Sequence, residues 1–274
     1  MAVFRDLDQA ALDALYNLRG ALPDHVQYLE RWARDSDQAR TEMACQINVP
    51  YGRHEMQKLD IFPAPRPHAP VLVFIHGGFW QRLDKGDYSF MARAWVDAGV
   101  TFVSVNYALA PKVGMDEMVS QVREAVTWVR RNAGKMNCDP EQVFLAGHSA
   151  GAHLAAMVMA EQEVAGAALV SGVYDLEAIR LSSVNEVVGL DADSARRNSP
   201  TLLERKGHGP LLLAVGGDEN AEFQRHHTEL AAKWQPARAL NLAGYHHFAT
   251  ADALGDPDSE VLGLMLEMMD GRLE

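Results

Sequence analysis

Short apolar runs alternate with amphipathic helical patterns along this chain from residue 71 onward. Strands buried on both faces are apolar throughout, and strand–helix alternation favours a mainly parallel sheet with right-handed crossovers. Helical periodicity recurs near 88–98, 116–133, 150–161, 223–234 and 257–270. The pattern predicts an α/β fold in which helices cover both faces of a central sheet. The predicted strands are VLVFIH, TFVSVNY, QVFLAG, VAGAALVSG, LLLAVGG and RALNLAG, which begin at residues 71, 101, 142, 164, 211 and 238.

Two segments depart from this alternation. The first 45 residues show two short amphipathic helical patterns, near 7–18 and 26–33, and two strands of a meander follow at 46–52 and 58–62. The segment 173–209 is polar and has no clear strand, so we expect a cap-like insertion near a ligand pocket. The helical N-terminal extension is expected to pack near the same pocket.

Composition limits the class of protein. A chain of 274 residues, 48% of them hydrophobic, can bury the core of one α/β domain spanning 1–274. The net charge of −12, without a dense basic cluster, argues against a nucleic-acid partner. No apolar run reaches the ~18 residues of a membrane span, and the first residues do not resemble a signal peptide. Two widely spaced cysteines fit a reducing, cytoplasmic compartment, and a homodimer remains open.

A serine lies between two glycines where one predicted strand meets the next helix. The sequence GHSAG places Ser149 between Gly147 and Gly151. A sharp strand-to-helix turn of this pattern exposes the serine hydroxyl, and a side chain at either glycine would collide in it. The pentapeptide is common by chance, and a small residue in an ordinary turn is the plain alternative. Its place in the alternation favours a nucleophilic Ser149.

A serine hydroxyl needs a base that removes its proton, and the chain offers candidates in a fitting order. On sheets with this turn, an acid follows a later strand and a histidine follows the last one. The segment YHHFAT follows the last predicted strand and offers His246 and His247, whereas GDEN follows the strand before it. Because the carboxylate usually comes three residues after the glycine that ends the strand, Gly216 favours Glu219, with Asp218 as the competing acid.

Stabilisation of developing negative charge requires backbone donors near the serine. The loop HGGFW, residues 76–80, follows the strand that begins at residue 71, and its glycines let the backbone approach a substrate closely. The amide of Ala150, at the start of a helix, adds a donor. Losing one donor of this kind costs about 10²–10³ in turnover.

These motifs together resemble the arylformamidase (kynurenine formamidase) family of α/β-hydrolases, whose signature is HGGxW. The resemblance rests on HGGFWQ, GHSAGAHLA, a later acid and HHF, and it covers most of the chain, including YNLRGALPDH near its start. Hormone-sensitive-lipase-like esterases are related, but they favour HGGG and GDSAGG, whereas this chain has Phe79 and His148 at the differing positions. The resemblance implies an α/β-hydrolase fold with a partial cap.

The resemblance also implies roles for individual residues. It makes Ser149 the nucleophile and His247, which precedes Phe248, the base. Spacing from Phe223 selects Glu219 as the acid, where relatives often have aspartate. The implied donors of the oxyanion hole are the amides of Gly78, Phe79 and Ala150.

The resemblance implies a serine hydrolase that cleaves a small-acyl amide of an arylamine, in particular a formyl amide such as N-formylkynurenine, through an acyl-enzyme. Two alternatives are a carboxylesterase of broad small-acyl specificity on the same triad and a non-catalytic, ligand-binding member of the fold. Aromatic side chains would suit the wall on the leaving-group side, and Trp80, Phe79 and Tyr174 are the candidates. No HExxH motif, cysteine cluster or P-loop suggests a metal or organic cofactor.

Overall fold

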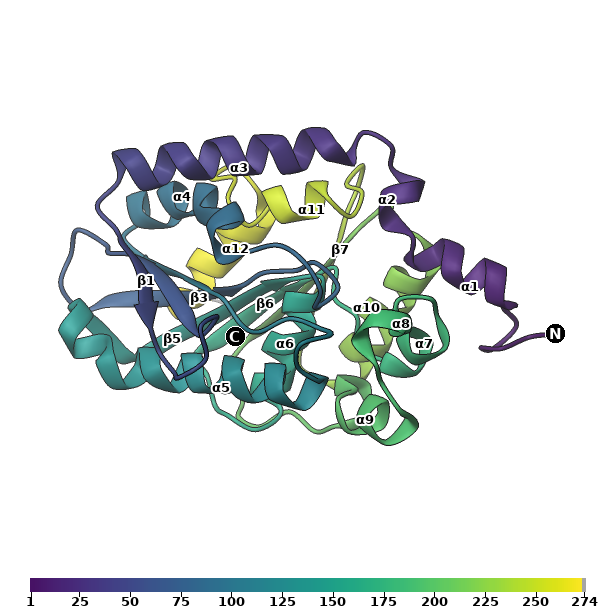
Figure 1. Ribbon diagram of the computed structural model, residues 1–274. Coiled ribbons are helices and arrows are strands. Elements are labelled where there is room, and N and C mark those ends of the chain that lie inside the picture. Colours follow the sequence, from purple (N-terminus) through teal and green to yellow (C-terminus); the bar gives the residue numbers. More distant parts are fainter. Residues whose placement is uncertain (273–274) are drawn as a thin grey trace.

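Within residues 1–272, which the computed structural model describes, an eight-stranded sheet forms the centre of the molecule (Figure 1). Its strand order is β1-β2-β4-β3-β5-β6-β7-β8. Strand β2 runs antiparallel to both neighbours, and all pairs from β4 to β8 are parallel. The strands are β1 Gln46–Pro50, β2 Lys58–Phe62, β3 Ala69–Ile75, β4 Thr101–Val105, β5 Cys138–His148, β6 Gly166–Val170, β7 Leu211–Gly216 and β8 Arg238–Leu242.

Helices cover both faces of this sheet, as the alternation predicted, and the α/β-hydrolase fold expected from the sequence is confirmed (Figure 1). One face packs against α5 (Met115–Asn132), α6 (Ala150–Met159) and α10 (Ala221–Lys233). The other face packs against α3 (His25–Glu42), α4 (Ala92–Asp97) and α12 (Glu260–Met269). The remaining helices are α1 Gln9–Tyr16, α2 Leu18–Ala21, α7 Leu176–Leu181, α8 Asn185–Val188, α9 Ala192–Arg197 and α11 Ala249–Asp252, with 3-10 turns η1 Lys85–Met91, η2 Ala133–Met136 and η3 Pro200–Leu202.

The two-residue period of a strand explains why both faces are apolar. In β3, Val71, Val73 and Ile75 join the core under α5 and α6, whereas Leu72 and Phe74 join the core under α3 and α4. All five side chains are completely buried. A strand of this kind reads as an uninterrupted apolar run because neither of its faces meets water.

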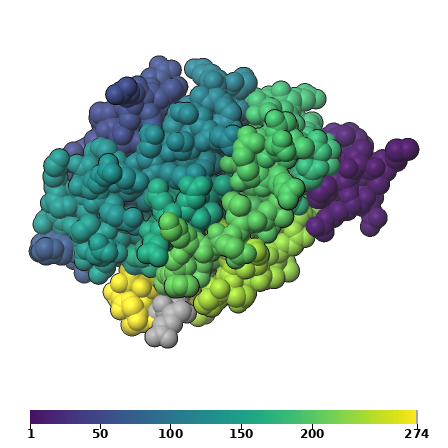
Figure 2. All heavy atoms as spheres, turned by 90° about the horizontal axis from the view of Figure 1, so that it is seen from below, coloured from purple at the N-terminus to yellow at the C-terminus, as the bar shows by residue number. Residues whose placement is uncertain are grey.

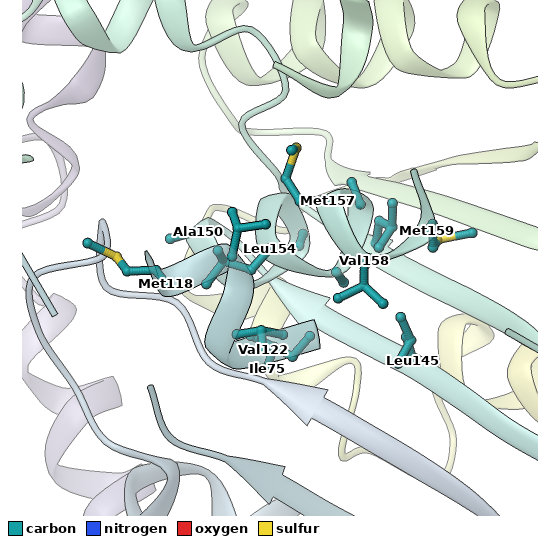
Figure 3. Close-up of a cluster of buried hydrophobic side chains, with 14 of the residues drawn as sticks. Ile75, Met118, Val122, Leu145, Ala150, Leu154, Met157, Val158 and Met159 are labelled. Carbon is teal, nitrogen blue, oxygen red and sulfur yellow. The ribbon is translucent and has the colours of Figure 1, made fainter. Parts of the chain in front are cut away.

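Helix α6 carries the start of the functional site, and it is buried on all sides. Figure 3 shows Leu154 and Val158 of α6 lying with Ile75 and Leu145 of the sheet and Val122 of α5. Every residue of α6 is buried. The residue that precedes this helix is therefore held in a rigid setting.

The N-terminal region differs from the prediction in one respect. The second predicted helix, near 26–33, is the 18-residue helix α3, which continues to Glu42. Its buried positions are Trp32, Ser36 and Ala39, one turn apart on the face that packs against η1. Serine and alanine are too small and too weakly apolar to extend the hydrophobic stripe in the sequence. The apolar periodicity therefore stops near residue 33, although the helix continues to Glu42.

The N-terminal helices and the inserted segment 173–209 meet at one end of the molecule. Figure 2 shows the purple N-terminal residues beside the green part of the chain, and Figure 1 shows α1 next to α7 and α8. Asp13 Oδ1 accepts a hydrogen bond from the amide of Ser183 (2.6 Å), and the Gln9 side chain donates to the carbonyl of Leu181 (2.9 Å). The inserted segment contains three short helices, α7 to α9, and the 3-10 turn η3.

Within residues 1–272, no helix combines the length and the apolar character that a bilayer crossing requires.

Candidate active site

Ser149 occupies a strained turn between β5 and α6. Its backbone has φ +57° and ψ −122°, a conformation that residues other than glycine rarely adopt. A Cβ at Gly151 would lie 1.9 Å from the carbonyl oxygen of Ile75, and one at Gly147 would lie 2.4 Å from the carbonyl oxygen of Gly151. Glycine at both positions therefore lets α6 start directly against β3 and β5. The turn presents the Ser149 hydroxyl at the carboxyl edge of the sheet.

Three side chains from distant parts of the chain form a hydrogen-bonded line. His247 Nε2 lies 3.0 Å from Ser149 Oγ, and His247 Nδ1 lies 2.5 Å from Glu219 Oε1. The two competing residues point elsewhere: Asp218 is exposed, and His246 Nε2 contacts the Tyr28 hydroxyl at 3.0 Å. The structure thus brings together Ser149 and Glu219, which the motif and its spacing favoured, and His247, which the resemblance implied. In this arrangement Nδ1–H donates to the carboxylate and leaves Nε2 free to accept the serine proton.

The carboxylate of Glu219 is held by two further donors. Its Oε2 accepts from the amide of Gly216 at 2.7 Å and from the Ser171 hydroxyl at 2.5 Å, and the glutamate side chain is 1% exposed. Sequence reasoning missed Ser171, which directly follows β6 and also contacts the Thr250 hydroxyl at 2.8 Å. The sequence feature that could have identified Ser171 is its position at the end of a predicted parallel strand, because side chains that follow such strands converge at one edge of the sheet.

His148 supports the loop that carries His247. Its Nε2–H donates to the carbonyl oxygen of His247 at 2.9 Å, and the Thr250 hydroxyl donates to the same oxygen at 2.8 Å. Burial, reinforced by the neighbouring His247, lowers the pKa of His148 well below its ordinary value. His148 is therefore neutral. Within residues 1–272 its buried Nδ1 has no hydrogen-bond partner.

The loop after β3 places backbone amides beside the serine. Gly78 and Phe79 line the same cavity as Ser149, and both have positive φ, +106° and +50°. A Cβ at Gly78 would lie 2.2 Å from the carbonyl oxygen of Arg82, so this turn requires glycine. Among the described residues, no protein group accepts a hydrogen bond from the amides of Gly78, Phe79 or Ala150. Ala150 begins α6, so its amide also lies at the positive end of a helix.

A cavity of about 500 Å³ opens onto Ser149 and His247. Its walls come from α1 to α3, from the loop after β3 and from the inserted segment, which contributes Ser183, Val184 and Val187. Five aromatic side chains line it: Tyr16, Trp32, Phe79, Tyr88 and Phe248. The N-terminal helices and residues 183–187 thus cover the site as a partial cap.

Two of the residues predicted to line the cavity, Trp80 and Tyr174, do not line it, so the prediction is wrong at these positions. Trp80 is completely buried, and its indole N–H donates to His153 Nδ1 at 3.2 Å. Tyr174 is 1% exposed and packs edge-on against His226. Neither lines the cavity. Sequence reasoning placed the adjacent aromatics of HGGFW together, but the turn sends Phe79 to the cavity and Trp80 to the core.

Tyr16 joins the N-terminal helix α1 to α10. Its hydroxyl donates to Glu222 Oε2 at 2.9 Å and contacts His226 Nε2 at 3.0 Å. Arg225 forms an ion pair with Glu222 at 2.7 Å. Burial lowers the pKa of His226 well below its ordinary value, so His226 is neutral and donates from Nε2. Because Tyr16 also lines the cavity, this network fixes one wall of the site to the element that follows Glu219.

Fold and site together define an α/β-hydrolase. A family model described as BD-FAE matches residues 59–190. The kynurenine formamidase of Salmo salar is 34% identical over 268 residues, covering 90% of this chain and 89% of that protein, and the Danio rerio kynurenine formamidase is 33% identical with 85% of each covered. The chain belongs to the kynurenine formamidase family, and it is a hydrolase.

Solved structures agree on the architecture. A putative thioesterase from Silicibacter sp. TM1040 superimposes with a TM-score of 0.84 at 27% identity, covering 94% of this chain and 98% of that one. A hyperthermophilic esterase from Pyrobaculum calidifontis superimposes with a TM-score of 0.72 at 18% identity, covering 97% and 98%, which shows the shared fold alone.

Proposed function

We propose that this enzyme is a serine hydrolase that removes a formyl group from an arylamine, with N-formylkynurenine as the model substrate. The observation that carries the proposal is the hydrogen-bonded line Ser149–His247–Glu219, which ends in a cavity with five aromatic residues. Aromatic walls suit an aryl leaving group because they bury its ring. The kynurenine formamidases of Salmo salar and Danio rerio support the choice of a formamide.

The first chemical step transfers the acyl group to the serine. His247 Nε2 takes the proton of Ser149 Oγ while Oγ forms a bond to the acyl carbon. The tetrahedral intermediate then collapses, its bond to nitrogen breaks, and protonated His247 gives its proton to the leaving arylamine. Glu219 keeps Nδ1–H of the histidine in place and stabilises the imidazolium that forms.

The second step returns the free enzyme. A water molecule gives one proton to His247 and attacks the formyl-enzyme, and Ser149 leaves with that proton as formate is released. In both steps the amides of Gly78, Phe79 and Ala150 would donate to the negative oxygen. Their lack of other acceptors among the described residues supports this role. The mechanism requires no metal or organic cofactor.

The test is a substrate panel with one variant. We expect the enzyme to hydrolyse N-formylkynurenine and simpler N-formyl arylamines, and we expect Ser149→Ala to abolish this turnover. Equal turnover of p-nitrophenyl acyl esters together with no turnover of formamides would contradict the proposal. Unimpaired function of Ser149→Ala would instead favour a non-catalytic, ligand-binding protein.

A second candidate is a carboxylesterase of broad small-acyl specificity on the same residues. The esterase names of several relatives favour it. Turnover of acetyl, propionyl and butyryl esters at steadily decreasing rates would distinguish it from an enzyme restricted to formyl groups. We further propose a cytoplasmic location, which the two free cysteines, Cys45 and Cys138, support.

A further inference from the structure

Two arginines line the cavity that contains Ser149. Arg19 lies in α2, within the YNLRG sequence near the start of the chain, and Arg82 follows the HGGFW loop. Within residues 1–272 neither guanidinium forms an ion pair or a side-chain hydrogen bond. Other arginines, such as Arg31 and Arg225, pair with carboxylates at 2.5 and 2.7 Å. Two unpaired guanidiniums in one cavity are therefore notable in a chain with more acidic than basic residues.

The positive charge of Arg82 acts on the guanidinium of Arg19. Partial burial and the positive charge of Arg82 both lower the pKa of Arg19 below its ordinary value. Two like charges that disfavour each other, and that have no ion-pair partner among the described residues, gain from an anionic ligand that both can contact. The planar fork of a guanidinium fits a carboxylate in particular.

Charge on the cavity wall contrasts with charge on the whole protein. The wall carries two arginines and one acid, Asp13, so its formal charge is +1 with neutral histidines, while the whole chain carries −12. Asp13 already accepts hydrogen bonds from the Ser183 amide and from Gln9, and it forms no ion pair with either arginine among the described residues. With the Glu219 carboxylate directly behind His247, the site is close to neutral, so an anionic group meets less repulsion there than elsewhere on this acidic protein.

We propose that Arg19 and Arg82 form a subsite for a carboxylate on the leaving group, so that the enzyme selects aryl formamides that carry a carboxylate. This inference rests on the proposed function, because it assigns part of the substrate of that site. The aromatic walls would hold the ring, and the arginine pair would hold the charged group that the ring carries. Selection then depends on residues outside the triad.

The test compares N-formylkynurenine with its carboxamide, which lacks the negative carboxylate. We expect kcat/KM of the natural enzyme to favour the acid, and this preference should fall by about 10-fold to 100-fold in the double variant Arg19→Gln, Arg82→Gln, the size expected for charged hydrogen bonds. Arg82→Glu should lower the preference for the acid more than the double variant does, because it places a negative charge beside the carboxylate. The preference should also fall as salt is raised, because Arg82 is exposed and Arg19 is only partly buried.

The matched control is Arg131→Gln, which removes the charge of an exposed arginine of α5 outside the cavity wall. It should keep the preference of the natural enzyme. An unchanged preference in the double variant, or an equal loss in Arg131→Gln, would overturn the subsite.

Binding separates this proposal from the proposed function. If the natural enzyme hydrolyses neither formamide, the proposed function fails, and calorimetry with kynurenine and its carboxamide still tests the arginines. Tighter binding of kynurenine, lost in the double variant, supports the subsite. Equal binding of the two compounds overturns it.

Discussion

The carboxylate of Glu219 lies 2.5 Å from Nδ1 of His247, while the neighbouring Asp218 is exposed. The difference follows from the end of β7, where the amide of Gly216 and the hydroxyl of Ser171 both donate to Glu219 and turn it inward. Two adjacent acids of equal charge therefore have different surroundings.

Replacing the two acids separately should give unequal effects. We expect Glu219→Gln to lower kcat by up to about 10⁴, because the amide can hold His247 in the wrong tautomer. The matched change Asp218→Asn should leave kcat within about twofold. Steady-state kinetics on one formamide substrate measures both, and the reverse ranking would transfer the acid role to Asp218.

His148 should act on kcat by positioning the base. Its Nε2–H donates to the carbonyl oxygen of His247, so His148→Leu should loosen the loop that carries the base. We expect kcat to fall about tenfold with little change in KM, the size of one lost hydrogen bond. His148→Gln, which keeps a donor, should recover part of the rate. A raised KM at unchanged kcat in His148→Leu would point to a role in substrate binding instead.

Stability should fall as the solution becomes acidic. Burial lowers the pKa values of His76, His148, His153 and His226, that of His153 to about 4. Between these folded-state values and the unfolded value near ~6.5, the unfolded chain binds more protons, so stability is complete above that value and is lost as pH falls through the window. Urea unfolding should show a midpoint that decreases from pH 7 toward pH 4.5.

One histidine allows a quantitative check of this dependence. A shift of this size for the fully buried His153 corresponds to about 3 kcal/mol between neutral and strongly acidic solution. His153→Gln can still accept from Trp80 and donate to the carbonyl of Asn198, so it should fold and show a shallower dependence on pH. The lowered pKa of His153 would be contradicted if the free energy of unfolding depended on pH equally in the variant and the natural protein, or if it did not depend on pH in the natural protein.

Two glycine-to-alanine substitutions should change the free energy of unfolding in opposite directions. Gly151→Ala places a Cβ 1.9 Å from a backbone oxygen of β3, and we expect a loss of about 3 kcal/mol of unfolding free energy because neither backbone can move freely. Gly263→Ala, in the middle of α12 with nothing within 4 Å, should gain about 0.5–1 kcal/mol from helix propensity. Urea titrations give both free energies. An unchanged free energy of unfolding in Gly151→Ala would show that the turn around Ser149 has room for a side chain at position 151.

Local patterns in the sequence determined the fold and the place of the nucleophile. The doubly buried strands appear as continuous apolar runs, and the helices between them keep a 3.6-residue period, so the order of strands and helices can be predicted. The strand bounds differ, since the run predicted at 142–147 lies within the longer β5, Cys138–His148. Ser149 could be located in the same way, because the two glycines that its turn requires are its near neighbours in sequence. The order of serine, acid and histidine narrowed each remaining partner to two adjacent residues.

Spacing favoured Glu219 and the family resemblance implied His247, but only the tertiary structure places both in one hydrogen-bonded line with Ser149 and builds the cavity. Whether His246 or His247 faces Ser149 depends on how a loop packs across 98 residues of sequence separation, and no local period records that packing. The same holds for the wall, where Phe79 turns to the cavity and Trp80 to the core, and where Tyr16, Trp32 and Arg19 arrive from the N-terminal helices. Sequence specifies which residues are buried or strained, but neighbours across the fold are set by the packing of elements against one another.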